Sequence, residues 1–414
     1  MSKVTETAKK AKVASRSIRN LSEDTRNTIL TEFAKAMIDK KDQIISANKK
    51  DMSEARNSGM SEAFLDRLKL DETRIRGMVD GVLDIVKLPD PLHKVLEEKT
   101  INSGIRMQKI TVPMGVIAII FESRPNVTAD CAALCFKAGS ACILKGGKES
   151  LNSCKAITDI FREVLRNNNI NEDSVVLLGN VTHEESRELM HCREYVDLLI
   201  PRGSRRLIEA VVTEAKVPVI ETGAGVCHAF VDESADFEMA VRIIINAKCS
   251  RPSVCNALEC LLVHEKIAEE FLPMVCKTLE EKGVVIYGDE KSCGIVNNIE
   301  AADEEAYYTE YNDLKLNLKI VKDVAEAIEH IEEHGTHHSD VIISNNSENV
   351  ISFFNEVDSA CVYHNASTRF TDGGMFMKGA EIGISTQKLH ARGPMGLDEL
   401  VTYAYYLKGE GQIR

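Results

Sequence analysis

One cysteine, Cys255, lies in a segment whose residue types could support nucleophilic chemistry. It follows Arg251 and Pro252 and precedes an apolar, strand-like run at 258–263. Proline fixes its own φ and disfavours helix at the residue before it, so we expect irregular backbone here. A nearby guanidinium can stabilise a thiolate, because cations lower the pKa of cysteine. Considered alone, Cys255 could equally be a buried structural cysteine, since free cysteines are among the most buried residues.

The elements that would position this cysteine form two α/β patterns. In the first, helical segments alternate with short apolar strands predicted at 116–121, 141–144, 175–178, 196–200 and 217–220. A second set of strands is predicted at 228–231, 258–263, 284–287, 318–321, 341–343 and 360–362. Short apolar strands between helices indicate parallel sheets covered on both faces, which bind ligands at the carboxyl ends of their strands. No G-x-G-x-x-G motif follows any of these strands, and Glu149 after Lys148 excludes a P-loop.

Two further kinds of element flank the α/β patterns. Amphipathic periodicity predicts one helix over 21–48 and another over 61–86. A polar hairpin is predicted over 96–112 about Asn102-Ser103-Gly104, and a β-like tail over 400–407. Isolated hairpins are marginal in water, so this one is expected to pack on another domain or subunit.

Composition limits the class of protein. The 414 residues suggest more than one domain, and 44% hydrophobic with 28% charged residues is typical of globular proteins. A net charge of -13 argues against a nucleic-acid partner, and no apolar run approaches a membrane span. Twelve cysteines without a C-x-x-C pair indicate reduced thiols in the cytoplasm. His330, His334, His337 and His338 are candidates for a metal site, but their spacing matches no known ligand pattern, so none is predicted.

Three segments together are specific for one family: FESRPNVT at 121–128, SRPSVCNALE at 250–259 and GAEIGISTQKLHARGPMG at 379–396. With them, and over nearly its whole length, the chain resembles the aldehyde dehydrogenase superfamily, in particular the branch that reduces γ-glutamyl phosphate. The resemblance implies an α/β, aldehyde-dehydrogenase-like fold with two doubly wound α/β domains and a small β oligomerisation element. It implies a Rossmann-like cofactor domain at 1–95, 113–224 and 364–395, a catalytic domain at 225–363, and an oligomerisation hairpin and tail at 96–112 and 396–414.

The resemblance also implies a mechanism in which Cys255 is the nucleophile. Its thiolate would attack the acyl carbon of L-glutamyl 5-phosphate, release phosphate and leave a thioester, which NADPH would reduce to L-glutamate 5-semialdehyde. Asn126 and the backbone N–H of Cys255 would stabilise the oxyanion. The enzyme would act in proline biosynthesis as a homo-oligomer, with its substrate supplied by a glutamate 5-kinase. Whether it is a dimer or a tetramer is left open.

NADPH is further indicated by Lys145 and Lys148, which follow the second strand of the first pattern. In doubly wound sheets an acid there reads the ribose of NAD, and a base reads the 2′-phosphate of NADP. The alternative is a solvated basic loop. The resemblance adds Gly203 and Ser204 at the pyrophosphate, where a helix begins, and Glu310 at the nicotinamide ribose.

An anionic substrate needs a local basic pocket in so acidic a chain. The candidates to bind its phosphate and α-carboxylate are Arg124, Arg251, Lys388, His390 and Arg392. Glu221 matches the water-activating glutamate of hydrolytic aldehyde dehydrogenases, and it is retained as a substrate-site residue without that role. Two rival functions remain, a hydrolytic aldehyde dehydrogenase and a non-catalytic binding protein of the same fold.

Overall fold

The structure, a computed structural model, describes residues 2–414. Contacts divide the chain into two compact units. The first contains 1–222, 377–383 and 395–414, and the second contains 223–376 and 384–394. The boundary near 222 lies close to the predicted one. Residues 364–376 and most of 384–395, however, pack with the second unit and not with the first as predicted, and the hairpin and tail pack with the first unit.

The first unit contains a four-stranded parallel sheet with strand order β5-β4-β3-β6. Its strands are β3 (Val116–Phe121), β4 (Ala141–Lys145), β5 (Val175–Leu177) and β6 (Leu198–Arg202). Every residue of β3 is buried, as its uninterrupted apolar sequence predicts. The predicted strand at 217–220 is wrong, because only an isolated bridge between Leu199 and Val219 forms there.

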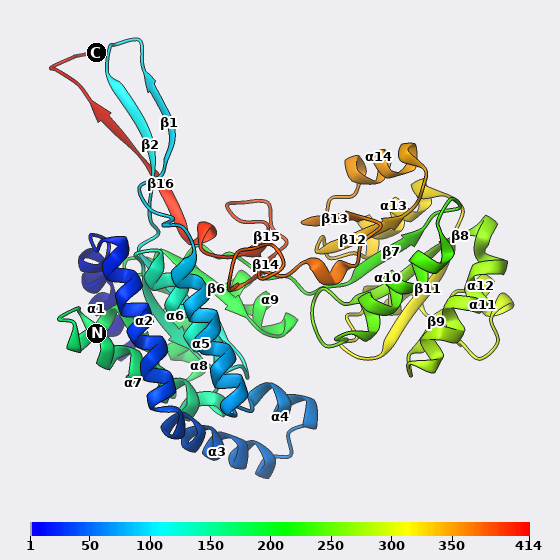
Figure 1. Cartoon of the computed structure of the whole chain (residues 1–414), viewed down its shortest axis with the longest axis horizontal. Coiled ribbons are helices and arrows are strands. Elements are labelled where there is room, and N and C mark those ends of the chain that lie inside the picture. Colours follow the sequence, from blue (N-terminus) through cyan, green and yellow to red (C-terminus); the bar gives the residue numbers. More distant parts are fainter. Residues whose placement is uncertain (1) are drawn as a thin grey trace. The chain divides into compact units, whose positions relative to one another are not determined.

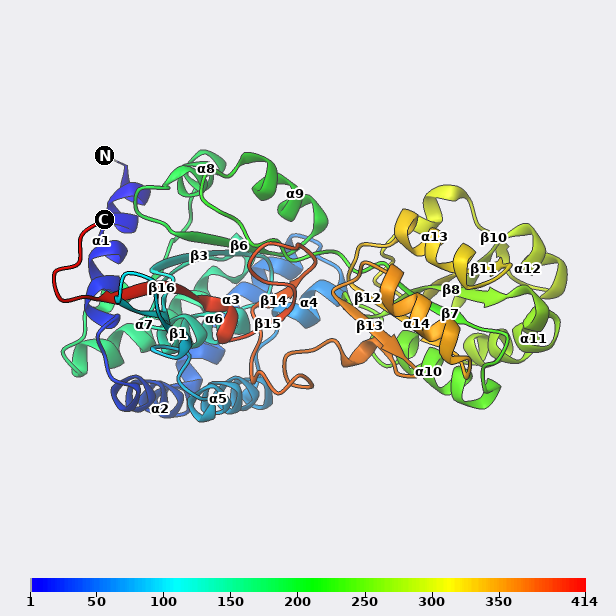
Figure 2. The same cartoon turned by 90° about the horizontal axis from the view of Figure 1, so that it is seen from above.

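Helices cover both faces of this sheet. They are α1 (Lys3–Ile18), α2 (Glu23–Asp39), α3 (Lys41–Asn57), α4 (Glu62–Leu68), α5 (Glu72–Lys87), α6 (Asn126–Lys137), α7 (Leu151–Asn167), α8 (His183–His191) and α9 (Arg205–Glu214). Figure 2 shows α8 and α9 on one side of the sheet and α6 on the other. Among the described residues, no helix has an apolar stretch long enough to cross a bilayer.

Two long helices predicted near the N-terminus are each divided in two. The segment 21–48 breaks at Lys40, whose φ of -107° and ψ of 19° end α2. The segment 61–86 breaks where Lys69 is extended and Asp71 caps α5 by accepting a hydrogen bond from the Arg74 N–H. Helix α1 lies before the predicted helices, and its buried face is lined mostly by small side chains such as Ala8 and Ala11.

A three-stranded antiparallel sheet belongs to the first unit (Figure 1). Its strand order is β1-β2-β16, with β1 (Val95–Thr100), β2 (Arg106–Pro113) and β16 (Val401–Lys408). Every residue of β1 is exposed. The predicted hairpin therefore exists, and the predicted tail pairs with it along the whole of β2.

The second unit contains a seven-stranded parallel sheet with strand order β10-β9-β11-β8-β7-β12-β13. The strands are β7 (Cys227–Val231), β8 (Leu258–His264), β9 (Val285–Gly288), β10 (Glu300–Ala301), β11 (Lys315–Val321), β12 (Ser339–Ile343) and β13 (Cys361–His364). Its helices are α10 (Phe237–Cys249), α11 (Glu265–Glu281), α12 (Glu290–Ile295), α13 (Val324–His334) and α14 (Ser347–Glu356). Two short strands, β14 (Gly383–Ser385) and β15 (Gly393–Met395), pair with each other.

Side chains of β8 divide between two hydrophobic cores. Leu261 and Val263 pack with α10 and α11 on one face of the sheet, whereas Cys260 and Leu262 pack with α13 and α14 on the other. This alternation follows from the two-residue period of a strand. The second sheet is thus buried on both faces, as the apolar runs in the sequence predict.

Candidate active site

Cys255 lies on the turn between the end of α10 and the start of β8. All twelve cysteines fall in the described part of the chain, and only Cys249, Cys255 and Cys293 are partly exposed. Burial raises the pKa of several of the others, for example that of Cys276 to about 12. Buried, protonated thiols are poor nucleophiles. Cys255 is thus one of three thiols accessible to a substrate and the only one of them on an irregular turn after an Arg-Pro pair.

Contacts with the carbonyl oxygen of Cys255 hold the turn in place, and they come from residues of the second unit. The Cys227 thiol donates to this oxygen at 3.3 Å. Gly225 packs so closely that a Cβ on this residue would lie 1.4 Å from the same oxygen. Glu310 in turn accepts a hydrogen bond from the Gly225 N–H at 3.0 Å. Glu310, predicted to bind the nicotinamide ribose, therefore supports the backbone beneath Cys255.

A second guanidinium, which the sequence did not single out, lies close to Cys255. Arg369 contacts the amide oxygen of Asn256 and donates from Nε to the Ser250 hydroxyl at 3.1 Å. Burial, followed by the charge of Arg251, lowers the pKa of Arg369, and Cys255 acts in the opposite direction. Arg251 itself is exposed. The turn around Cys255 therefore carries two guanidinium groups, those of Arg251 and Arg369. No sequence motif marks Arg369, and only the fold brings it to the turn that carries Cys255.

The basic run at 388–392 lies in the second unit, but its charges are partly neutralised. Lys388 and Arg392 both form ion pairs with Asp358, at 2.5 and 2.8 Å. These contacts hold the pKa of Asp358 below its usual range. His390 is exposed and has a φ of 66°. An anionic ligand at this run would compete with Asp358.

The predicted cofactor residues of the first unit lie at the carboxyl ends of its strands. Lys145 ends β4 and is half-buried, and burial lowers its pKa while Glu149 and Glu122 oppose that shift. Lys148 is exposed on the next turn. Glu149 accepts hydrogen bonds from both the N–H and the hydroxyl of Ser123, each at 2.9 Å. This carboxylate is thus held toward Ser123.

Gly203 and Ser204 precede α9, as the sequence predicts. The Ser204 hydroxyl caps α9 by accepting from the Leu207 N–H, and the Ser204 N–H donates to Glu122 at 2.7 Å. A Cβ on Gly203 would lie 2.5 Å from a carboxylate oxygen of Glu122, so glycine permits this approach. A helix start can bind a phosphate group through its backbone N–H groups, and here Glu122 occupies that of Ser204.

Asn126 is the first residue of α6 and follows β3 through Arg124 and Pro125. Its side-chain amide donates to Asp130 one helical turn later, at 3.4 Å. Burial raises the pKa of Asp130 to about 6, and the charge of Arg202 opposes that shift. Arg124 and Glu221 are half-buried in the same unit. Asn126 and Arg124 thus follow β3, Lys145 and Lys148 lie at the end of β4, and Gly203 and Ser204 follow β6, whereas Glu310 lies in the second unit.

Of the four histidines considered as a metal site, His330 and His334 stack with 4.0 Å between their ring centroids. His334 contacts Glu304 at 2.9 Å, and His338 contacts the Ser339 hydroxyl at 2.9 Å. Burial lowers the pKa of His338 to about 4. His330 instead faces His228 and Cys260, which lie elsewhere in the sequence.

The family model for the aldehyde dehydrogenase family matches residues 1–294. The chain therefore belongs to the aldehyde dehydrogenase family. Relatives within it include the gamma-glutamyl phosphate reductase of Clostridium perfringens, 52% identical over 98% of each chain, and that of Carboxydothermus hydrogenoformans, 50% identical over 100% of each. A crystal structure of gamma-glutamyl phosphate reductase from Thermotoga maritima matches with a TM-score of 0.97, 46% identity and full coverage of both chains. The predicted resemblance and fold class are confirmed.

Proposed function

We propose that this chain reduces L-glutamyl 5-phosphate to L-glutamate 5-semialdehyde, with NADPH as reductant and release of phosphate, in proline biosynthesis. The observation that carries the proposal is the partly exposed Cys255 on a turn fixed by Gly225 and flanked by two arginines. This turn occurs in a chain about half identical to enzymes named gamma-glutamyl phosphate reductase. We further propose that the protein works in the cytoplasm as a homo-oligomer and receives its substrate from a glutamate 5-kinase.

The first half of the proposed reaction is an acyl transfer to sulfur. The Cys255 thiolate forms a bond to the acyl carbon, the carbon–oxygen bond to phosphate breaks, and phosphate leaves with the electron pair. Asn126 and the Cys255 N–H stabilise the oxyanion, and removing one such donor typically costs about 100- to 1,000-fold in rate. When bound, NADPH supplies the hydride that converts the acyl group to an aldehyde. Cys255 then leaves as a thiolate, whose charge Arg251 and Arg369 offset.

The residues of the first sheet edge favour NADPH over NADH. An NAD-specific site uses an acid for the ribose hydroxyls, but Glu149 is occupied by Ser123. Lys145 and Lys148 provide charges for a 2′-phosphate. Gly203 and Ser204 would hold the pyrophosphate at the start of α9. Glu310 is proposed to reach the nicotinamide ribose from its position beside the Cys255 turn.

For the substrate anions, we propose Arg124 and Arg251 as the principal contacts. Lys388 and Arg392 would contribute only by exchanging Asp358 for the substrate, and His390 would accompany them. Glu221 is proposed to line the substrate site without activating water, because the acyl acceptor in the reverse direction is phosphate.

The test uses the reverse reaction, with glutamate semialdehyde and NADP⁺. Steady formation of NADPH should require added phosphate, and without phosphate no more than about one turnover per active site should occur, since the thioester persists. Cys255→Ala should abolish turnover and retain nucleotide binding, whereas Cys249→Ala, at the partly exposed thiol nearest in sequence, should retain most activity. Sustained turnover without phosphate that yields glutamate would refute the proposal and support the hydrolytic rival. Full activity in Cys255→Ala would refute the thioester.

A further inference from the structure

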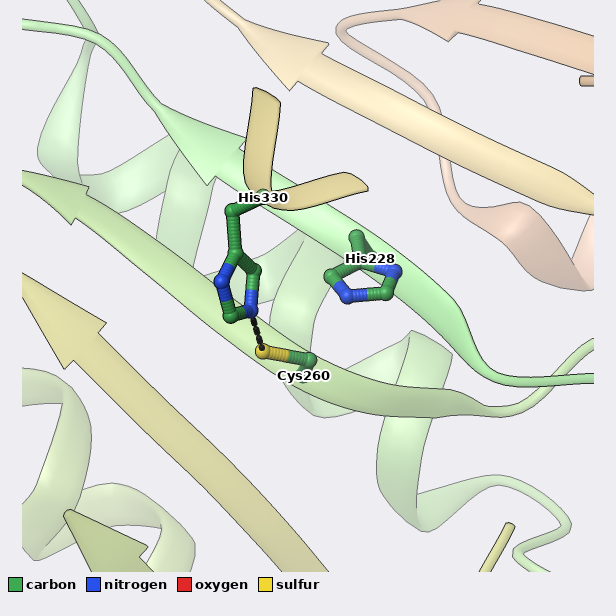
Figure 3. A group of neighbouring side chains, drawn as sticks. All are labelled: His228, Cys260 and His330. Atoms are coloured by element: carbon green, nitrogen blue, oxygen red, sulfur yellow. Dashed lines mark hydrogen bonds between the residues drawn. The ribbon is translucent and has the colours of Figure 1, made fainter. Parts of the chain in front are cut away.

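Three potential metal ligands form a cluster in the second unit, in a core that the proposed reaction does not use. His228 of β7, Cys260 of β8 and His330 of α13 each offer one ligand atom, and these atoms lie within 4.8 Å of one another (Figure 3). Their exposed fractions are 0%, 0% and 4%. Figure 3 shows the three side chains converging from the two neighbouring strands and the helix above them.

The first observation that points to a ligand is an unpartnered nitrogen. The His228 Nδ1 lies 3.1 Å from the Val226 carbonyl oxygen and 3.4 Å from a carboxylate oxygen of Asp340. Both oxygens accept, so Nδ1 carries a hydrogen, and in the tautomer that binds a metal the lone pair is on Nε2. This Nε2 is buried and has no hydrogen-bond partner. Buried polar atoms are rarely left unsatisfied, and metal-binding histidines typically donate their other N–H to a carbonyl in this way.

The second observation is the geometry of the other two ligands. Cys260 Sγ lies 3.7 Å from His330 Nε2. An ion bonded to sulfur at about 2.3 Å and to nitrogen at about 2.0–2.1 Å holds these atoms about 3.5 to 3.8 Å apart at tetrahedral to trigonal angles.

We propose that His228, Cys260 and His330 bind one thiophilic metal ion in a three-coordinate site, and that this ion is Cu(I). Structural Zn²⁺ takes four ligands, but among the described residues this cluster has no fourth histidine, cysteine or carboxylate. Soft thiolate ligands select Cu(I), and a His₂Cys set is a known copper ligand set. One thiolate balances the single charge of Cu(I), so no net charge is added to the buried site.

Binding forms one copper–sulfur and two copper–nitrogen bonds, breaks the Cys260 S–H bond and releases its proton to solvent, with no change of oxidation state. The charged groups that act on Cys260 are Lys319 and the carboxylates Asp340, Glu259 and Asp289. The ion would join β7, β8 and α13, so its binding should stabilise the second unit. Burial raises the pKa of the Cys260 thiol, so we expect slow uptake that accelerates when the unit opens locally.

The experiment uses the full-length protein carrying Cys249→Ser, Cys255→Ser and Cys293→Ser, stripped of metal, so that the three partly exposed thiols cannot bind copper. It is titrated without oxygen with Cu(I) held by the chromophoric chelator bicinchoninate. We expect transfer of about one ion per chain and an X-ray absorption spectrum with one sulfur and two nitrogen ligands. The thermal midpoint should rise on binding.

Three variants distinguish this site from adventitious binding. His228→Asn keeps a donor for the Val226 carbonyl but lacks Nε2, and Cys260→Ser keeps the volume but lacks the thiolate; both should lose the copper and the thermal shift. Cys276→Ser, at a buried cysteine of the opposite core, should retain both. If His228→Asn does not fold, as judged by its circular dichroism, His330→Gln replaces it. Equal uptake by Cys260→Ser and Cys276→Ser, no uptake by the parent, or uptake of Zn²⁺ alone in a four-ligand site would each overturn the proposal.

Discussion

Replacing Asp130 by asparagine should stabilise the first unit at neutral pH. Burial raises the pKa of Asp130 from 3.8 to about 6. Between these values the folded carboxyl keeps its proton while the unfolded one has released it, so stability falls as the pH rises from about 4 to 6. A pKa shift of about 2 units corresponds to about 3 kcal/mol at 1.4 kcal/mol per unit. The asparagine side chain is not ionisable and keeps an oxygen for the Asn126 amide.

The assay is urea unfolding of the parent and of Asp130→Asn at pH 5, 6, 7 and 8, followed by circular dichroism. The advantage of the variant should grow from pH 5 to 7 and stay constant above, at about 1–3 kcal/mol because Asp130 retains some contact with solvent. Asp80→Asn, at an exposed aspartate of α5, should show no such trend. In infrared difference spectra the parent alone should show a carboxylic-acid band that disappears near pH 6. A constant stability difference from pH 5 to 8 would refute the burial argument.

Three further predictions concern the turn at Cys255, the nucleotide site and the buried ion pair of the second unit. Gly225→Ala should lower kcat by at least about 100-fold, because its Cβ displaces the carbonyl of Cys255, the proposed nucleophile, while Gly294→Ala, with open space around it, should not. Lys148→Ala should raise the Kd for NADPH about tenfold and leave that for NADH nearly unchanged in fluorescence titrations; equal effects would contradict a 2′-phosphate contact. Glu259→Met should lower the free energy of unfolding by about 3–5 kcal/mol, because Lys248 would stay buried without the partner that now lies 2.8 Å away. The double variant Glu259→Met, Lys248→Met should recover most of this loss in denaturant unfolding.

The sequence predicted the elements whose signal is local. The apolar run of β3 and the Arg-Pro turn before Cys255 could be predicted because each depends on residues that are adjacent in the sequence. The break at Lys40 was not predictable, because neither proline nor glycine marks it and tertiary packing decides it.

The contacts of the site that the sequence did not predict join distant segments. Glu310 reaches Gly225 across 85 positions, and Arg369 reaches Asn256 across 113. Nothing in the spacing of such residues indicates that they meet. The same is true of the His228, Cys260 and His330 cluster, whose members come from three elements that only the parallel sheet and its covering helix bring together.

Because β16 pairs with the hairpin, one edge of β2 stays unpaired during most of the synthesis of the chain. The ribosome completes β1 and β2 long before β16, since residues 114–400 intervene. At about 5–20 residues per second this interval lasts about 15 to 60 s. During that time β2 presents an unpaired edge, and such edges invite association with other nascent chains. Glu97, Glu98 and Lys99 place charges on the partner strand beside it, which limits wrong pairing until the correct strand emerges from the tunnel.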